Sequence, residues 1–141
     1  MTATDFICDL AEVLFYLAGR GYDALAVVSH AALESGWGES PLFTSYCNPW
    51  GIKGCDVTFD TKEYINGEER ILKDSFKAYA SRFEAAVDYD LLIKDRFPVA
   101  WQYRDQPFLY FLALQVHGYA TDPYYFQKLV KIYRQLKGGE L

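Results

Sequence analysis

Residues 32–54 read "ALESGWGESPLFTSYCNPWGIKG", and they carry the change from helix to loop on which the fold depends. Glu34 falls in the last predicted turn of the helix, where unpaired backbone carbonyls disfavour negative charge. Apolar Leu33 and Trp37 lie close to it in sequence and would withdraw it from water. Both effects raise the pKa of a carboxyl group, so Glu34 is a candidate general acid. The ordinary alternative is a surface glutamate at a frayed helix end.

Segments on both sides of this stretch have helical periodicity. Apolar residues recur every three or four positions, and Gly36 and Gly118 follow two periodic segments as helix-terminating glycines do. The pattern predicts helices at residues 4–18, 23–35, 82–97, 106–118 and 122–137, and a long loop at residues 36–55. The segment 106–118 is nearly all apolar, so we expect a buried central helix there. Candidate N-caps are Thr4 or Asp5, Ser81 with Glu84 as its reciprocal acid, and Asp122 followed by Pro123.

Between the helical segments the apolar pattern changes to a period of two. "NG" at positions 66–67 separates two alternating runs, and this pair is a strong hairpin signal. We expect strands at residues 57–65 and 68–76, with Glu63 opposite Arg70. A cationic neighbour favours the ionised form of Glu63, and two carboxyl groups in opposed environments are typical of acid-and-base sugar chemistry. The ordinary alternative is a cross-strand ion pair on a solvated face.

These elements predict an α+β fold that is mostly α-helical and carries a small β-hairpin. A length of 141 residues favours a single domain spanning positions 1–141. The chain contains 12 Tyr, 10 Phe and 3 Trp, which is enough for a core and for the lining of a groove.

Charge and composition argue against several classes of partner. The formal net charge is −5 and no basic stripe is present, so no nucleic acid or anionic membrane is expected as a partner. No apolar run approaches the roughly 18 residues of a membrane span. The first basic residue is Arg20, so no signal peptide is predicted. The histidines and cysteines match no metal-ligand spacing, and neither a metal nor a cofactor is predicted.

Five further side chains are candidates for a functional or structural role. Tyr119 lies between a helix terminator and a strong cap, so its phenol could orient a substrate or donate to a developing charge; a core tyrosine is the alternative. His30 lies one helical turn before Glu34, and we expect it to be a packed or hydrogen-bonded helix residue. Cys47 and Cys55 bracket the glycine-rich loop and are candidates for a disulfide, which would leave Cys8 as a buried free thiol.

Four motifs together resemble glycoside hydrolase family 73, the N-acetylglucosaminidases of autolysins, flagellar rod-cap peptidoglycan hydrolases and some phage lysins. They are "ALESGWGES", "NPWGIKG", "TKEY" with "NGE", and "YATDPYY" with "KL", in this order over nearly the whole chain. Any one of them alone would be weak. The resemblance implies a lysozyme-like fold in which a helical lobe and a β-hairpin flap flank a substrate groove.

The resemblance also implies roles for individual residues. Glu34 matches the catalytic acid, Glu63 the acidic residue of the hairpin, and Tyr119 the tyrosine of the "YATDP" motif. The implied substrate is the peptidoglycan glycan strand, cut at the β-1,4 bond after N-acetylglucosamine and before N-acetylmuramic acid. The loop after Glu34 is expected to line the groove through Trp37, Phe43, Asn48, Trp50, Gly51 and Lys53.

Several alternatives stay open at the level of the sequence. Glu63 could activate a water for an inverting displacement, or the 2-acetamido group of the sugar could act as the nucleophile. A muramidase or lytic transglycosylase on the same fold, and a non-catalytic glycan-binding module, are the other functions to consider. We expect a monomer that reaches the cell wall, in the periplasm or outside the cell. The routes to consider are holin release, delivery by a secretion system, and export as part of a larger protein.

Overall fold

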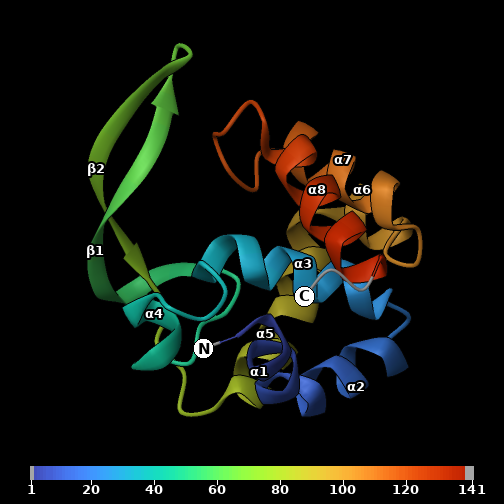
Figure 1. Ribbon diagram of the computed structural model, residues 1–141. Helices are drawn as coiled ribbons and strands as arrows, with labels where there is room; N and C mark the ends of the chain where they lie inside the picture. Colours follow the sequence, from blue (N-terminus) through green and yellow to red (C-terminus); the bar gives the residue numbers. More distant parts are fainter. Residues whose placement is uncertain (1, 139–141) are drawn as a thin grey trace.

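The structure is a computed structural model that describes residues 2–138 of the chain. A body of helices carries a two-stranded β-hairpin that stands out from one side (Figure 1). The helices are α1 (Ala3–Asp9), α2 (Ala11–Gly19), α3 (Ala24–Ser35), α4 (Pro41–Thr44), α5 (Arg82–Arg96), α6 (Pro98–Gln102), α7 (Pro107–Val116) and α8 (Tyr125–Lys137), and the strands are β1 (Lys53–Ile65) and β2 (Glu68–Phe76).

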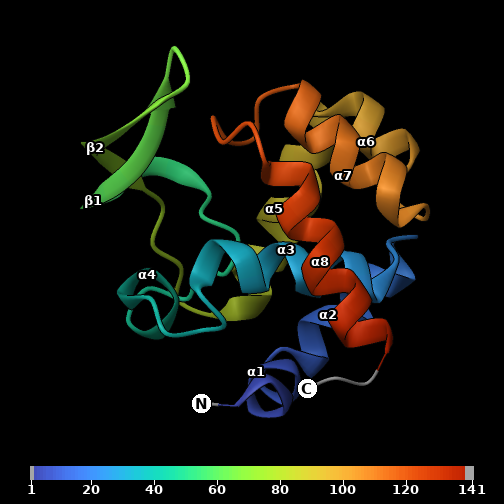
Figure 2. The ribbon, with the colours of Figure 1, turned by 45° about the horizontal axis from the view of Figure 1, so that its top comes forward.

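Helix α3 lies in the middle of the helical body (Figure 2). Its ends agree with the prediction: the Asp23 side chain accepts a hydrogen bond from the Ala26 N–H, and Gly36 ends the helix with a φ of 57°. Because α3 packs against α2, α7 and α8, the helix is buried on most of its circumference. Even the polar side chains of Ser29 and His30 are fully buried. The last turn of α3 therefore reaches the groove from inside the core.

The hairpin also has the predicted register. Ile65 pairs with Glu68 and Glu63 with Arg70, and both turn residues, Asn66 and Gly67, have the positive φ that a type I′ turn requires. Strand β1 begins earlier than predicted, because Lys53 and Val57 both align with Phe76 and enclose a bulge. The bulge brings Lys53 into the hairpin, next to the groove.

The N-terminal prediction of one helix over residues 4–18 was wrong. The chain forms α1 and α2, which meet at the fully buried Leu10. Thr2, and not Thr4 or Asp5, caps α1, and Asp5 bonds back to the Thr2 N–H in a capping box. Cys8 is exposed, contrary to the prediction, because α1 buries the face that carries Phe6 and Leu10.

The second half of the chain shows three further differences. Helix α7 is not buried all round: Phe108, Leu109, Leu112 and Val116 lie on an exposed face. The last helix begins at Tyr125, so Pro123 precedes it, and Asp122 accepts from the Tyr124 N–H instead of capping the helix. The short helices α4 and α6 were not predicted. Ser81 caps α5 as expected, whereas the Glu84 carboxylate accepts from the Ala80 N–H.

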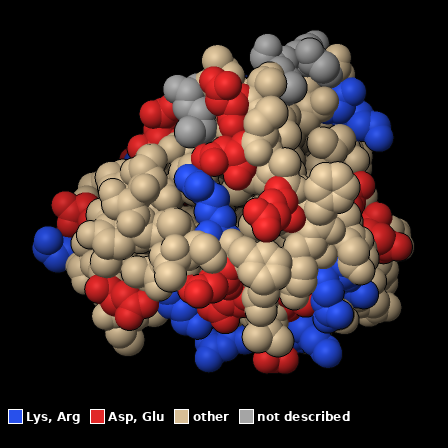
Figure 3. Space-filling model, turned by 90° about the horizontal axis from the view of Figure 1, so that it is seen from below, with Lys and Arg blue, Asp and Glu red and all other residues tan. Residues whose placement is uncertain are grey.

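Within residues 2–138, none of the helices is both long enough and apolar enough to cross a membrane. Figure 3 shows acidic and basic side chains interspersed on the face of the molecule that is seen from below. That mixture agrees with the modest net charge of −5.

Candidate active site

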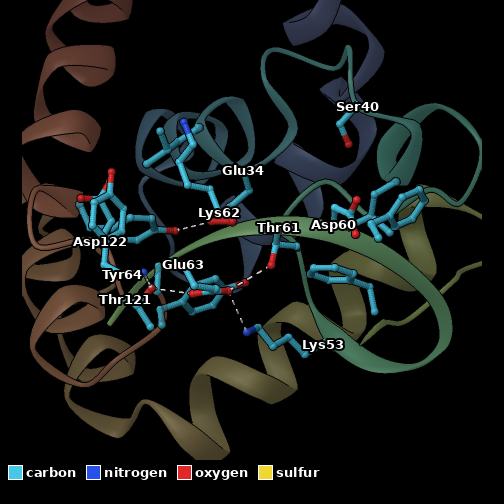
Figure 4. Close-up of a pocket in the computed structure, with 18 of the residues that line it drawn as sticks. Glu34, Ser40, Lys53, Asp60, Thr61, Lys62, Glu63, Tyr64, Thr121 and Asp122 are labelled. Atoms are coloured by element: carbon cyan, nitrogen blue, oxygen red, sulfur yellow. Dashed lines mark hydrogen bonds and ion pairs between the residues drawn. The ribbon is translucent and has the colours of Figure 1, made fainter. Parts of the chain in front are cut away.

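A pocket of about 440 Å³ opens between the end of α3, the hairpin and the loop before α8. Figure 4 shows Glu34 and Glu63 at this pocket, with Lys53 and Thr121 on either side of Glu63. A second hollow of about 520 Å³ continues from Gly51, Lys53 and Glu63 toward α5. The two hollows share the lining residues Gly51, Lys53, Glu63, Tyr119, Ala120 and Thr121, so they form one groove that passes beneath the hairpin.

The two carboxyl oxygens of Glu34 have different neighbours. Oε2 accepts a hydrogen bond of 2.8 Å from the Tyr125 hydroxyl. Oε1 lies against Gly51, where an added Cβ would come within 3.0 Å of it. Since Gly51 also has a φ of +65°, a glycine is needed at this position for two independent reasons.

Burial raises the pKa of Glu34 from an ordinary 4.5 to about 7, against the opposing effects of the Tyr125 hydrogen bond and the positive charge of Lys53. The expected direction of the shift is therefore supported, with core packing around the carboxyl as its main cause. A substantial fraction of Glu34 carries a proton near neutral pH, as a general acid requires.

Glu63 has partners different from the one predicted. Arg70 lies opposite it in the ladder but bonds to Glu68 at 3.0 Å, because its long side chain follows the solvated surface of the hairpin. Glu63 instead accepts a 2.5 Å hydrogen bond from Thr121 Oγ1 and lies 3.6 Å from Lys53 Nζ. The same Thr121 oxygen accepts from the backbone N–H of Tyr64 at 3.0 Å. Thr121 therefore ties the hairpin to the loop before α8.

Tyr119 lines the groove, but its hydroxyl is already engaged. It donates a 2.6 Å hydrogen bond to the Trp50 carbonyl, directly before Gly51. Its ring lies edge-on to His30 at 4.4 Å and 5.3 Å from the ring of Phe97. In this arrangement Tyr119 holds the Trp50–Gly51 turn against Glu34.

Four of the six predicted groove residues belong to the core or the scaffold. Trp50 and Phe43 are fully buried, and Trp50 stacks on Tyr89 while its Nε1 donates to the Val27 carbonyl. Asn48 is buried and bonds to backbone groups of Ile52 and Lys77. Trp37 packs edge-on against Phe6 and does not line either hollow. These side chains shape the loop from beneath, and only Gly51 and Lys53 line the groove as predicted.

The expected disulfide is not formed: Cys47 and Cys55 are both free thiols. Cys47 has a φ of 55°, and its N–H bonds to the Phe43 carbonyl in the turn after α4. Cys55 lies exposed in the bulged first part of β1. Hydrogen bonds of Asn48 stabilise the loop where a disulfide was predicted.

Three residues of the site were not predicted: Tyr125, Thr121 and Asp74, which holds the Lys53 ammonium at 2.5 Å. Tyr124 and Tyr125 are adjacent and chemically identical, yet Tyr124 is 60% exposed and Tyr125 only 3%. A one-residue error in the start of α8 exchanges these two positions. The "YATDPYY" motif was the available signal, but it does not say which tyrosine faces inward.

A groove that holds one carboxyl group with a raised pKa and a second carboxyl group on a facing hairpin is the kind of site that glycoside hydrolases use. The chain belongs to the Glucosaminidase family, described as mannosyl-glycoprotein endo-beta-N-acetylglucosaminidase, whose pattern matches residues 16–138. The resemblance inferred from the four motifs is thereby confirmed.

Individual relatives agree with this assignment. The chain is 36% identical to the peptidoglycan hydrolase FlgJ of Salmonella typhimurium, over 79% of this chain and 39% of that protein. It is 34% identical to the exo-glucosaminidase LytG of Bacillus subtilis, over 74% of this chain and 41% of that protein. The chain thus spans about two fifths of the length of these curated relatives.

Among solved structures, a C-terminally truncated glycoside hydrolase domain of Salmonella typhimurium FlgJ matches with a TM-score of 0.70 and 31% identity. The match covers 97% of this chain and 99% of that one. The predicted fold, a helical lobe with a β-hairpin beside a groove, is confirmed.

Proposed function

We propose that this chain hydrolyses the β-1,4 bond between N-acetylglucosamine and N-acetylmuramic acid in peptidoglycan, with Glu34 as the general acid. The observation that carries the proposal is the half-buried Glu34 carboxyl at the groove, whose pKa is raised to about 7 by burial. The names of the relatives, peptidoglycan hydrolase and exo-glucosaminidase, support the choice of polymer and bond.

In the proposed reaction, Glu34 gives its proton to the glycosidic oxygen as the bond to the anomeric carbon breaks. Glu34 is neutral while it carries the proton and becomes an anion when it gives the proton up, and this anion is stabilised by the Tyr125 hydroxyl and by the positive charge of Lys53. Glu63 and Lys53 lie together on the hairpin side of the groove. There the Glu63 carboxylate can stabilise the positive charge that develops on the sugar, while Lys53, which is held by Asp74, fixes the position of Glu63.

Two routes remain for the attack on the anomeric carbon. In the first, Glu63 takes a proton from a water, which then displaces the leaving group with inversion. In the second, the 2-acetamido oxygen of the sugar attacks and Glu63 acts only through its charge. The anomeric configuration of the first-formed product separates them: inversion indicates the water route, and retention indicates the substrate-assisted route.

We further propose that residues 1–141 act as one glucosaminidase domain, as a monomer, on the cell wall in the periplasm or outside the cell. The family match across residues 16–138 supports the domain assignment. Holin release, a secretion system, or export within a longer chain are the delivery routes compatible with a cell-wall substrate.

The test of the proposed function is the identity of the new reducing end. Purified peptidoglycan is digested, reduced with borohydride and hydrolysed, and the reduced amino sugar is identified. Glucosaminitol, from a reduced N-acetylglucosamine end, is the expected product, and the Glu34→Gln variant should give almost none. A reduced muramic acid would indicate a muramidase, and an anhydromuramyl end would indicate a lytic transglycosylase. Glycan binding without any cleavage would indicate a non-catalytic glycan-binding module.

A further inference from the structure

A chain of hydrogen bonds runs from the protein core to Glu34. His30 is fully buried, with Nδ1 2.7 Å from the Tyr89 hydroxyl and Nε2 2.7 Å from the Tyr125 hydroxyl. Tyr125 donates in turn to Glu34 Oε2 at 2.8 Å. At the other end, the Tyr89 hydroxyl bonds to the hydroxyl of Tyr110, which is also fully buried. The chain links side chains from α3, α5, α7 and α8.

The imidazole of His30 is neutral in this environment. Aromatic rings surround it: Tyr119 lies edge-on at 4.4 Å, Tyr89 at 5.6 Å and Tyr125 at 5.9 Å. Burial lowers the pKa of His30 from 6.5 to about 3. A neutral imidazole has one N–H donor and one acceptor nitrogen, so each of its two contacts has a defined direction.

Only two directions are possible for the whole chain. If Nε2 carries the proton, it donates to Tyr125, Tyr125 donates to Glu34 Oε2, and Nδ1 accepts from Tyr89, which accepts from Tyr110. If Nδ1 carries the proton, every bond is reversed, and Glu34 must itself donate through Oε2. Within residues 2–138, Tyr89 is the one hydrogen-bond partner of the Tyr110 hydroxyl. The reversed direction would therefore leave the buried Tyr110 proton without an acceptor, which is costly.

We propose that His30, as its Nε2–H tautomer, is a positioning residue that directs the Tyr125 hydroxyl onto Oε2 of Glu34 and so leaves the catalytic proton on Oε1. Oε1 is the oxygen that lies against Gly51 in the groove lining. When Oε2 accepts from Tyr125, the proton of a neutral Glu34 is favoured on Oε1, because the carbonyl oxygen of a carboxyl group is a better acceptor than its hydroxyl oxygen. A proton on Oε2 would instead point into the core and be held by Tyr125. The inference rests on the proposed role of Glu34 as general acid.

The first test reads the tautomer directly and needs no substrate. Long-range ¹H–¹⁵N spectra of the protein labelled at histidine should show a pyrrole-like Nε2 and a pyridine-like Nδ1 for His30. The chain has two histidines, so the His117→Gln variant identifies the signals of His30. A pyrrole-like Nδ1 would overturn the proposal even in a fully active enzyme, and the spectrum can be read even if no peptidoglycan is cleaved.

The second test uses two substitutions of His30. In His30→Leu we expect kcat to fall about 10- to 100-fold with KM nearly unchanged, because the acid is misdirected and His30 does not line the groove. The pH above which kcat falls should move to a higher value. The reason is that the Tyr125 hydrogen bond, which lowers the pKa of Glu34, is weakened. The glutamine side chain of His30→Gln offers a donor and an acceptor. This variant should recover most of kcat and the pH dependence of the wild type.

Thermal unfolding of both variants shows whether a loss of activity comes from a misplaced Glu34 proton or from a failure to fold. If the Leu variant does not fold, the Gln variant and the tautomer still decide the question. A folded Leu variant with wild-type kcat and pH profile would refute the proposal. So would a folded Gln variant that is as impaired as the Leu variant.

Discussion

The two carboxyl groups of the groove lie on opposite kinds of structure. Glu34 ends a helix that is buried on most sides, and its partners, Tyr125 and Gly51, are themselves fixed by core packing. Glu63 lies on a two-stranded hairpin whose outer side chains, such as Ile71 at 65% exposure, face solvent. Its partners are the polar side chains of Thr121, Lys53 and Thr61.

This difference separates two ways in which the fold fixes the state of a carboxyl group at the groove. The protonation of Glu34 depends on burial, a property of the folded core that persists for as long as the core does. The placement of Glu63 depends on a few polar contacts between the hairpin and the loop before α8. An isolated hairpin is marginal unless it is packed, so we expect this side of the groove to be the more mobile one.

The largest expected effect distinguishes the two carboxyl groups by substitution. Glu34→Gln keeps the shape and removes the proton donor, so the rate of peptidoglycan cleavage should fall by about 10²–10⁴-fold with binding retained. Glu63→Gln should cost a comparable factor if it is a general base, and less if it acts only through charge. Cleavage kinetics on purified glycan strands measure both. Added azide should restore activity to Glu63→Gln only if Glu63 is a general base. Near wild-type activity of Glu34→Gln would contradict the proposed acid.

A second prediction concerns stability and pH. The pKa of Glu34 is about 7 in the fold against 4.5 for an ordinary glutamate, so its stabilising contribution is present at low pH and is lost as the pH rises through 7. The Glu34→Gln variant has no titrating carboxyl at this position, so its stability does not fall in this way as the pH rises. Between pH 5 and pH 8 the free energy of unfolding of the variant should gain about 2–3 kcal/mol relative to wild type. Urea unfolding of both proteins at the two pH values measures it, and a constant difference would mean that the carboxyl is not desolvated.

The smallest expected effect concerns the tie between the hairpin and the loop before α8. Thr121→Val removes the hydroxyl that links Glu63 to the Tyr64 backbone, and the rate of cleavage should fall by about 10-fold while the midpoint of thermal unfolding changes little. Thr58→Val is a matched control, because Thr58 lies on the same hairpin, bonds to Ser75 and does not line either hollow. Equal losses of activity in the two variants would show that the tie has no special role.

Much of the fold could be predicted from short-range patterns. The ends of α3, the register of the hairpin and its turn at Asn66 and Gly67 agree with prediction. Each depends on interactions between residues close in sequence, such as a capping side chain, a glycine with positive φ or alternation along a strand. The same local reasoning placed Glu34 at the end of its helix and Glu63 in the hairpin.

The remaining features depend on contacts between segments that are distant in sequence. Whether an aromatic residue lines a groove or fills the core is decided by what packs on it, and Trp50 is buried because Tyr89, 39 positions away, stacks on its ring. The choice between Tyr124 and Tyr125 as the partner of Glu34 depends on how α8 is rotated against α3. By itself, the sequence determined where the two carboxyl groups lie along the chain. Tertiary packing decided their partners, because burial and hydrogen bonds across the core depend on several elements at once.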